Sequence, residues 1–245
     1  MSRLVAVILA AGKGKRMKSD LPKVLHKIND RPMVHYVIDL AKKVGSEKTI
    51  LIIGHGKELV MDQCKNMDVQ FAVQQEQLGT GHAVLMSADE LNGYDGDVLV
   101  LSGDVPLLTA ETIRELINTQ QESGAAATIL TSELDDPTGY GRIIRDKNNF
   151  VSNIVEHKDA NPEELKIREI NVGIYIFKAV DLFRALKLVR NDNNQGEYYL
   201  PDVVPIFLSD GKMVNAVKTK NFNETRGIND VDQLKEAETI LNSER

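Results

Sequence analysis

The order of its short apolar runs constrains the fold of this chain more than any other feature. Leu4–Leu9 (LVAVIL) is rich in Val and Ile, which is typical of a strand buried on both faces of a parallel sheet. From there to residue 131, such runs alternate with segments whose apolar residues recur at helical spacing. This alternation predicts a parallel sheet with helices on both faces.

The remaining elements follow from the same patterns. In the first half we expect strands at Thr49–Ile53, Val69–Val73, Asp97–Leu101 and Ala125–Thr131, and helices at Pro32–Val44, Lys57–Lys65, Thr80–Asp89 and Thr109–Ser123. In the second half we expect a hairpin of Arg142–Arg145 and Phe150–Glu156, and strands at Glu169–Phe177 and Met213–Val217. We expect helices at Val180–Leu188, at Tyr199–Ser209, where Pro201 and Pro205 interrupt the helix early, and at Val231–Ser243. The prediction is one α/β domain with a β-rich lobe built from the second half.

Composition excludes several classes of protein. The chain has 245 residues and a net charge of -6, which argues against nonspecific binding to nucleic acid or to a membrane. Its single cysteine, Cys64, excludes an internal disulfide and a Cys-rich zinc site, and we expect it to be a packing or surface residue. A spanning helix needs about 18 consecutive apolar residues, and the sequence contains no such run. We expect a cytoplasmic protein.

A glycine-rich, basic loop follows the first strand. Gly12 and Gly14 allow backbone N–H groups to approach an anion, and the basic side chains are those of Lys13, Lys15, Arg16 and Lys23. These features indicate a polyphosphate cradle, with a basic surface loop as the alternative. Met17 stands where both the P-loop and the dinucleotide fingerprint need glycine, which excludes these two cradles.

Asp104 directly follows a buried strand. The carboxyl ends of strands are where α/β sheets place ligands, and a carboxylate there suits Mg²⁺. A helix cap or loop carboxylate is the alternative. We expect His82 to be a helix residue packed against the sheet rather than a catalytic group.

Several segments resemble the sugar-1-phosphate nucleotidyltransferases, and within them the uridylyltransferase domain of the bacterial N-acetylglucosamine-1-phosphate uridylyltransferases. The segments are Leu9–Met17 with Leu21–Lys23, Gln74–Ala83, Gly103–Leu107, Asp136–Arg142, Val155–Asp159, Glu169–Asn171, Gln195–Tyr199 and Gly227–Asn229. The resemblance implies a Rossmann-like, mostly parallel sheet flanked by helices, with a β-rich sugar-binding lobe. It implies transfer of UMP from UTP to N-acetylglucosamine 1-phosphate, which yields UDP-N-acetylglucosamine, a peptidoglycan precursor for cell-wall biogenesis, and pyrophosphate.

The resemblance also implies residue roles. The catalytic cations would be Arg16 and Lys23, and Mg²⁺, the expected cofactor, would be held by Asp104 and Asn229. The nucleotide would contact Leu9, Ala10, Ala11, Gly12, Gly14, Lys23, Gln74, Gly79, Thr80 and Gly103. The sugar would contact Gly141, Glu156 and Asn171, with Glu197 and Tyr198 as weaker candidates; an ion pair of Glu156 with Lys158 or Arg142, and a turn role for Gly141, are the alternatives.

Three positions depart from the family pattern, namely Lys15, Ser102 and Val172, and they affect expected affinity more than reaction type. We expect residues 1–229 to form the nucleotidyltransferase domain and 230–245 a C-terminal helix, without the left-handed β-helix acetyltransferase domain of the bifunctional members. On that expectation the protein would be a monomer or weak dimer. The competing functions are the same reaction with another nucleotide or sugar, a non-catalytic nucleotide-sugar sensor, and a dehydrogenase, which Met17 disfavours.

Overall fold

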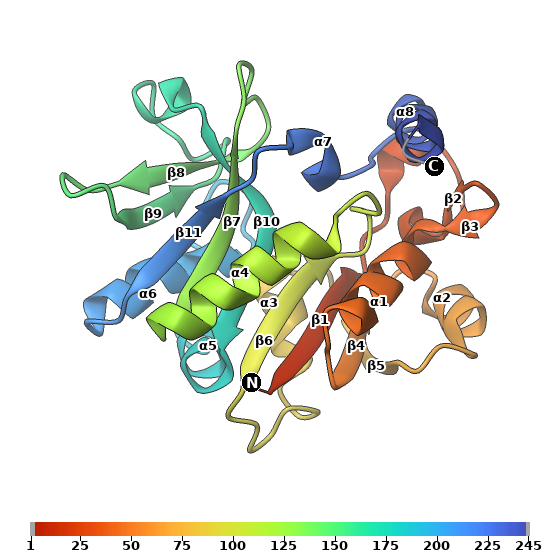
Figure 1. Ribbon diagram of the computed structural model, residues 1–245, viewed down its shortest axis with the longest axis horizontal. Helices are drawn as coiled ribbons and strands as arrows, with labels where there is room; N and C mark the ends of the chain where they lie inside the picture. Colours follow the sequence, from red (N-terminus) through yellow and green to blue (C-terminus); the bar gives the residue numbers. More distant parts are fainter. Residues whose placement is uncertain (1–2, 244–245) are drawn as a thin grey trace.

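The computed structural model describes residues 3–243, which fold around one twisted sheet (Figure 1). The strands are β1 (Leu4–Ala10), β4 (Lys48–Ile53), β5 (Gln70–Val73), β6 (Asp97–Ser102), β7 (Ala127–Glu133), β8 (Gly141–Arg145), β9 (Val151–Val155), β10 (Glu169–Lys178) and β11 (Val214–Lys218). The main path through the sheet is β11-β7-β10-β6-β1-β4-β5. The α/β fold predicted from the alternating pattern is confirmed.

One strand of that path runs against the others in the described part of the chain. β10 pairs antiparallel with both β6 and β7, whereas β1, β4, β5 and the pair β7–β11 are joined in parallel. The amino end of β10 also pairs with β8, which in turn pairs with β9 as the expected hairpin. The β-rich lobe is therefore this hairpin, while β10 and β11, also from the second half, belong to the main sheet.

Helices cover both faces of the sheet, because successive side chains of each buried strand point to opposite faces. Leu4, Ala6 and Ile8 of β1 belong to one core cluster, and Val5 and Val7 belong to another. The first cluster includes α1 (Met33–Lys43), α2 (Lys57–Cys64) and α4 (Ala110–Ser123). The second includes α3 (Thr80–Leu85), α5 (Ala179–Leu186) and α6 (Val203–Ser209).

Three local features of the sequence can be compared with the structure in detail. A threonine just before a helical pattern is a typical N-cap, and Thr109 has this role in α4, since its hydroxyl accepts a hydrogen bond from the Thr112 backbone N–H at 3.3 Å. Cys64 is buried in the core, and burial raises the pKa of its thiol to about 11, so it is a packing residue. The early interruption expected in the helix from Tyr199 to Ser209 is confirmed at Pro201, which lies in a 3-10 turn, Leu200–Asp202, before α6 begins. Pro205 does not break α6, because it lies in the first turn, where a backbone N–H has no partner within the helix.

A third, small cluster joins the predicted helix at Val231–Ser243 to a short hairpin that the sequence patterns did not predict. The short strands β2 (Lys27–Ile28) and β3 (Arg31–Pro32) form a hairpin beneath α8 (Val231–Ser243), and α7 (Phe222–Thr225) precedes α8. Ile28, Met33 and Ile228 pack there with Ala237. The expected division at residue 229 stays a prediction, and residues 1–2 and 244–245 of its two parts lie outside the described chain.

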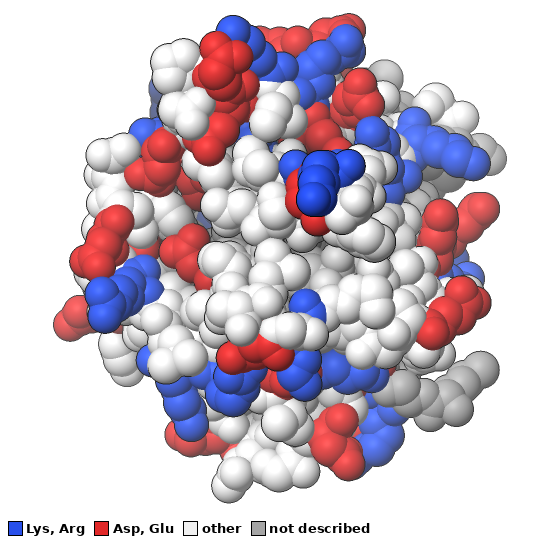
Figure 2. Space-filling model, turned by 90° about the vertical axis from the view of Figure 1, so that its left-hand side faces the viewer, with Lys and Arg blue, Asp and Glu red and all other residues white. Residues whose placement is uncertain are grey.

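The surface matches a mildly acidic protein. On the face shown in Figure 2, acidic and basic side chains are interspersed, and neither sign forms a continuous field. Within residues 3–243, no helix has the length and apolar character needed to cross a bilayer.

Candidate active site

A crevice lies at the carboxyl ends of β1 and β6, where the order of the strands along the sheet reverses. β1 pairs with β4 on one side and with β6 on the other, and ligands of open α/β sheets bind at such switch points. The glycine-rich loop leaves β1 here and leads to a 3-10 turn at Lys15–Met17 and another at Lys23–Leu25. The side chain of Lys15 lies outside the description.

Gly14 allows this loop to fold tightly against Lys23. Its φ of +58° is in the left-handed region, and a Cβ placed on it would lie 2.6 Å from Cβ of Lys23. A side chain at this position would therefore be strained and would displace Lys23. The absence of a side chain at Gly14 therefore allows Lys23 to occupy its observed position.

Four of the predicted residues converge at the mouth of the crevice. Lys23 forms an ion pair with Asp104, and its ammonium also donates to Oδ1 of Asn229 at 2.6 Å. Arg16 donates to the same Oδ1 at 2.7 Å. The backbone N–H of Ile228 donates to the carbonyl of Asp104 at 2.9 Å, which holds the segment before α8 against the end of β6. Residues more than 200 positions apart in the chain thus form one polar cluster.

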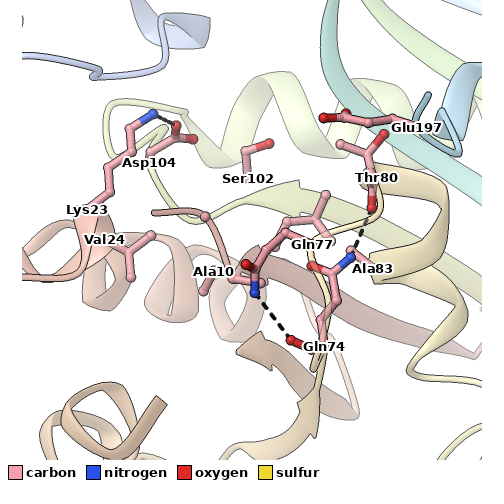
Figure 3. A pocket seen from close by; sticks show the side chains of 14 residues that line it. Ala10, Lys23, Val24, Gln74, Gln77, Thr80, Ala83, Ser102, Asp104 and Glu197 are labelled. Atoms are coloured by element: carbon pink, nitrogen blue, oxygen red, sulfur yellow. Dashed lines mark hydrogen bonds and ion pairs between the residues drawn. The ribbon is translucent and has the colours of Figure 1, made fainter. Parts of the chain in front are cut away.

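A cavity of about 280 Å³ extends from this cluster along the strand ends (Figure 3). Of the predicted nucleotide contacts, those lining it are Leu9, Ala10, Ala11, Gly12, Lys23, Gln74, Gly79 and Thr80. Gly14 and Gly103 lie behind the wall: Gly14 packs against Lys23, and the Gly103 N–H donates to the carbonyl of Leu9 at 2.9 Å. Four wall residues are not among the predicted contacts: Val24, Gln77, Ala83 and Ser102, the last of which departs from the family pattern.

The loop before α3 is held by the segment that precedes α6. Tyr198 accepts a hydrogen bond from the Gly81 N–H and donates its own N–H to Leu78, both at 2.8 Å. At Gly79, with a φ of +112°, a Cβ would lie 2.6 Å from the Tyr198 carbonyl oxygen. Tyr198 thus contacts the loop through its backbone, and Glu197, expected near the sugar, lines the cavity beside Thr80.

A second cavity, of about 210 Å³, lies between the sheet and the β8–β9 hairpin. Gly141, Glu156 and Asn171, the three main predicted sugar contacts, all line it. Leu9, Thr80 and Ser102 line both cavities. The two spaces are therefore neighbours with a common wall.

An irregular turn of β10 places Asn171 in this second cavity. The register of β10 against β7 shifts between Asn171 and Tyr175, and Gly173 has a φ of +79°. Asn171 donates to the Tyr175 hydroxyl at 2.6 Å and accepts from the Gly173 N–H at 3.1 Å. These contacts fix the amide and leave it one N–H for a ligand.

Glu156 follows β9 and lies among acidic neighbours. Burial raises the pKa of Glu156 most, and the charges of Asp202, Asp159 and Glu197 raise it further. The anticipated cations bind elsewhere: Lys158 donates to Oε1 of Gln195 at 2.7 Å, and Arg142 contacts the Tyr140 carbonyl and His157. The alternative of an ion pair with Glu156 is therefore wrong, and its carboxylate faces the cavity.

Other walls of the second cavity were not predicted individually. Tyr140, which packs edge-on against Phe222 at 6.0 Å, lines it together with Tyr175 and Leu200. Tyr140 lies inside the Asp136–Arg142 segment, so the motif identified the region but not this side chain. Val172, noted as a departure, is also part of this wall.

The polar cluster fits a magnesium ion through the chemistry of its oxygen atoms. A carboxylate oxygen of Asp104 and the amide oxygen of Asn229 contact the same ammonium group, so both are directed at one cationic position. Mg²⁺ is commonly bound by one or two protein oxygens together with water and substrate phosphates. Among residues 3–243 no group of three His, Cys, Asp or Glu side chains is arranged to hold a metal without such additional ligands.

Comparisons with known proteins agree with this geometry. A family model described as Nucleotidyl transferase matches residues 5–234. The bifunctional protein GlmU of Bacillus cereus (strain AH187) is 51% identical over 241 residues, covering 98% of this chain and 52% of that protein. The bifunctional protein GlmU of Bacillus thuringiensis (strain Al Hakam) shows the same identity and coverage. The chain spans about half the length of these curated relatives.

A solved structure supports the fold independently. The crystal structure of UDP-glucose pyrophosphorylase complexed with UDP-glucose matches the whole of both chains with a TM-score of 0.76 at 19% identity. This confirms a mixed α/β fold of the nucleotide-sugar transferase type, with a mostly parallel central sheet. Because the family model covers most of the sequence, this protein belongs to the nucleotidyl transferase family.

Proposed function

We propose that the protein transfers UMP from UTP to N-acetylglucosamine 1-phosphate, giving UDP-N-acetylglucosamine and pyrophosphate. The observation that carries this proposal is the pair of adjoining cavities, one with a buried amide at Gln74 and one with hydroxyl-binding groups at Glu156 and Asn171. Two substrates bound in these cavities would lie side by side across the common wall, and the polar cluster lies at the mouth of the first cavity. Identity to the GlmU relatives supports the choice of nucleotide and sugar.

In the proposed reaction, a phosphate oxygen of the sugar attacks the α-phosphorus of UTP. The bond from that phosphorus to the bridging oxygen breaks, and pyrophosphate leaves with the electron pair. Catalysis of this kind depends on positioning and on neutralising phosphate charge. Arg16 and Lys23 supply positive charge beside the triphosphate, and the backbone of Ala11–Gly14 approaches it closely.

Members of this family generally depend on Mg²⁺. We propose that Asp104 and Asn229 hold the ion, which when bound neutralises negative charge on the phosphates. Lys23 contacts the Asp104 carboxylate and the Asn229 amide oxygen. With a metal ion at those oxygens, its ammonium group would have the triphosphate as its anionic partner. Residues 1–229 provide every proposed contact. Gln233 of α8 accepts a hydrogen bond from the Asn229 backbone N–H at 2.7 Å and so helps to position Asn229.

The test is pyrophosphate release with N-acetylglucosamine 1-phosphate and, separately, UTP, CTP, TTP, ATP and GTP, each with Mg²⁺ and with EDTA. The same assays are repeated with glucose 1-phosphate as the sugar phosphate. We expect release with UTP that EDTA abolishes. Release with another nucleotide would overturn the choice of base, and release with glucose 1-phosphate only would overturn the choice of sugar. Binding of UTP without turnover of any sugar phosphate would favour the nucleotide-sugar sensor.

A further inference from the structure

The orientation of one buried amide is fixed by two contacts on the same side. Gln74 is 3% exposed and lines the first cavity. Its amide nitrogen lies 3.0 Å from the carbonyl oxygen of Gly79 and 3.0 Å from Nδ1 of His82. A backbone carbonyl only accepts hydrogen bonds, so the nitrogen rather than the oxygen of the Gln74 amide must face Gly79.

The second contact involves the remaining hydrogen of that nitrogen. Nδ1 of a neutral imidazole accepts a hydrogen bond when the ring hydrogen is on Nε2. With one hydrogen directed at Gly79 and the other at His82, both amide donors are used. The oxygen of Gln74 is left for a ligand, and in Figure 3 it lies on the other side of the amide from the bond to Gly79.

We propose that His82 is a positioning residue that makes Gln74 a hydrogen-bond acceptor only, and thereby selects nucleotides whose base presents an N–H. This inference rests on the proposed function, because it takes the occupant of the cavity to be a pyrimidine nucleotide. Uracil has an N–H at N3, whereas cytosine has a bare acceptor nitrogen there. An acceptor facing an acceptor leaves both groups unpaired, and sites of this kind reject the wrong ligand strongly.

The structure explains why a histidine suits this position. His82 is the third residue of α3, and the Gly79 carbonyl also accepts the first hydrogen bond of that helix, from the Ala83 N–H at 3.0 Å. The loop that shapes the cavity and the helix that carries the imidazole are thus fixed together. A side chain without an acceptor at the Nδ1 position would leave the Gly79 carbonyl as the one described contact that holds this orientation. The amide could then turn and present its nitrogen to a base such as cytosine.

The experiment compares His82→Phe, which keeps a ring without an acceptor, with His82→Asn, whose side-chain oxygen can take the place of Nδ1. Met86→Leu, at the C-terminal end of α3, is the control for packing. kcat and KM are measured separately for UTP and CTP, and binding of each nucleotide to the substrate-free protein is measured by calorimetry. If Phe is not accommodated, His82→Leu makes the same comparison.

In His82→Phe we expect KM for UTP to rise about tenfold with little change in kcat, and the preference for UTP over CTP to fall about tenfold. His82→Asn should retain most of the preference, as should Met86→Leu. An unchanged preference in folded His82→Phe, or equal loss in His82→Asn, would overturn the proposal. If the wild-type protein binds UTP in preference to CTP without turnover, the proposed function fails while the binding data still decide the role of His82.

Discussion

The ammonium group of Lys23 pairs with the carboxylate of Asp104, and the two side chains are only 13% and 21% exposed. The same ammonium contacts Asn229, so it stands where the two proposed metal ligands converge. A lysine and a divalent cation repel each other at such short range. Metal binding and the movement of Lys23 toward the triphosphate are therefore expected to be coupled.

Replacing Lys23 with methionine should have opposite effects on metal binding and turnover. Removal of the ammonium frees both oxygens, so Mn²⁺, followed by electron paramagnetic resonance, should bind the nucleotide-free protein more tightly. Turnover should fall about 10²–10³-fold, the usual cost of losing a transition-state charge contact. Lys27→Met, at an exposed lysine of β2 outside the polar cluster, is the control. Weaker Mn²⁺ binding in Lys23→Met would contradict the coupling.

Arg16 lies at the edge of the cluster and is exposed, so its replacement should leave stability almost unchanged. Arg16→Ala is expected to lower kcat about 10²–10³-fold, because the guanidinium supplies charge to the phosphates. Arg16→Lys should recover part of the loss, since it keeps the charge but not the planar group. Arg114→Ala, at an exposed arginine of α4 that lines neither cavity, is the control. Equal kcat in Arg16→Ala and wild type would remove Arg16 from the catalytic set.

Gly14 and Gly124 offer a matched pair of glycines. Both have left-handed backbones, with φ of +58° and +62°, but only at Gly14 would a Cβ meet another residue, Lys23. Alanine at either position should cost about 1 kcal/mol or more of stability through backbone strain. Only Gly14→Ala should also reduce kcat, since it displaces Lys23. Thermal unfolding and steady-state kinetics on both variants separate the two effects; similar kcat values would show that the contact has no catalytic consequence.

Glu156 should make the affinity for the sugar phosphate depend on pH. A carboxylate accepts hydrogen bonds from sugar hydroxyls, and protonation removes part of that capacity. The pKa of Glu156 is raised by burial and by its acidic neighbours, so kcat/KM for the sugar phosphate should decline as pH falls through that raised value. Glu156→Gln should raise KM about tenfold and flatten this dependence. An identical pH profile in the variant would exclude Glu156 as the titrating group.

Asp202 should affect stability in a defined pH window. Burial, followed by the charge of Asp159, raises the pKa of Asp202 to about 6. A carboxyl group with a folded pKa above its unfolded value disfavours folding once ionised, so the penalty is absent below about pH 4, develops between there and about pH 6, and is complete above it.

Asp202→Asn should therefore stabilise the protein by about 1 kcal/mol at pH 8, after allowance for its partial exposure, and have little effect at pH 4. Chemical denaturation at the two pH values gives the comparison. Asp68→Asn, at an exposed aspartate, should change neither value. Equal stabilisation by Asp202→Asn at both pH values would contradict the titration and indicate a packing effect.

The elements that the sequence predicted are those set by local patterns. β1, α1 and α4 follow from apolar periodicity, and the Thr109 cap follows from side-chain chemistry. The position of β10 between β6 and β7 does not follow, because a buried apolar strand looks the same in sequence whichever way its neighbours run. Pairing over such distances is decided by the packing of the whole sheet.

The same distinction holds at the candidate site. Gly12, Lys23 and Asp104 are recognisable because the loop and the strand end give them a chemical context. Tyr198 contacts the Leu78–Gly81 loop through backbone atoms, which every residue possesses, so no side chain could signal that role. The helical pattern around His82 predicts only that it packs against the sheet. Its contact with Gln74 depends on a distance between two elements that no local pattern encodes.

β10 gives the two cavities a common frame. One end of this strand is hydrogen-bonded to the hairpin that walls the second cavity, and the other end is hydrogen-bonded to β6, which Asp104 follows closely. Any displacement of the hairpin relative to the sheet must bend this strand, and the ladder is already interrupted between Asn171 and Tyr175. The shape of β10 at this interruption therefore helps to set where the cavity under the hairpin lies relative to the cation cluster, together with the contacts that β9 makes with α6 and β11.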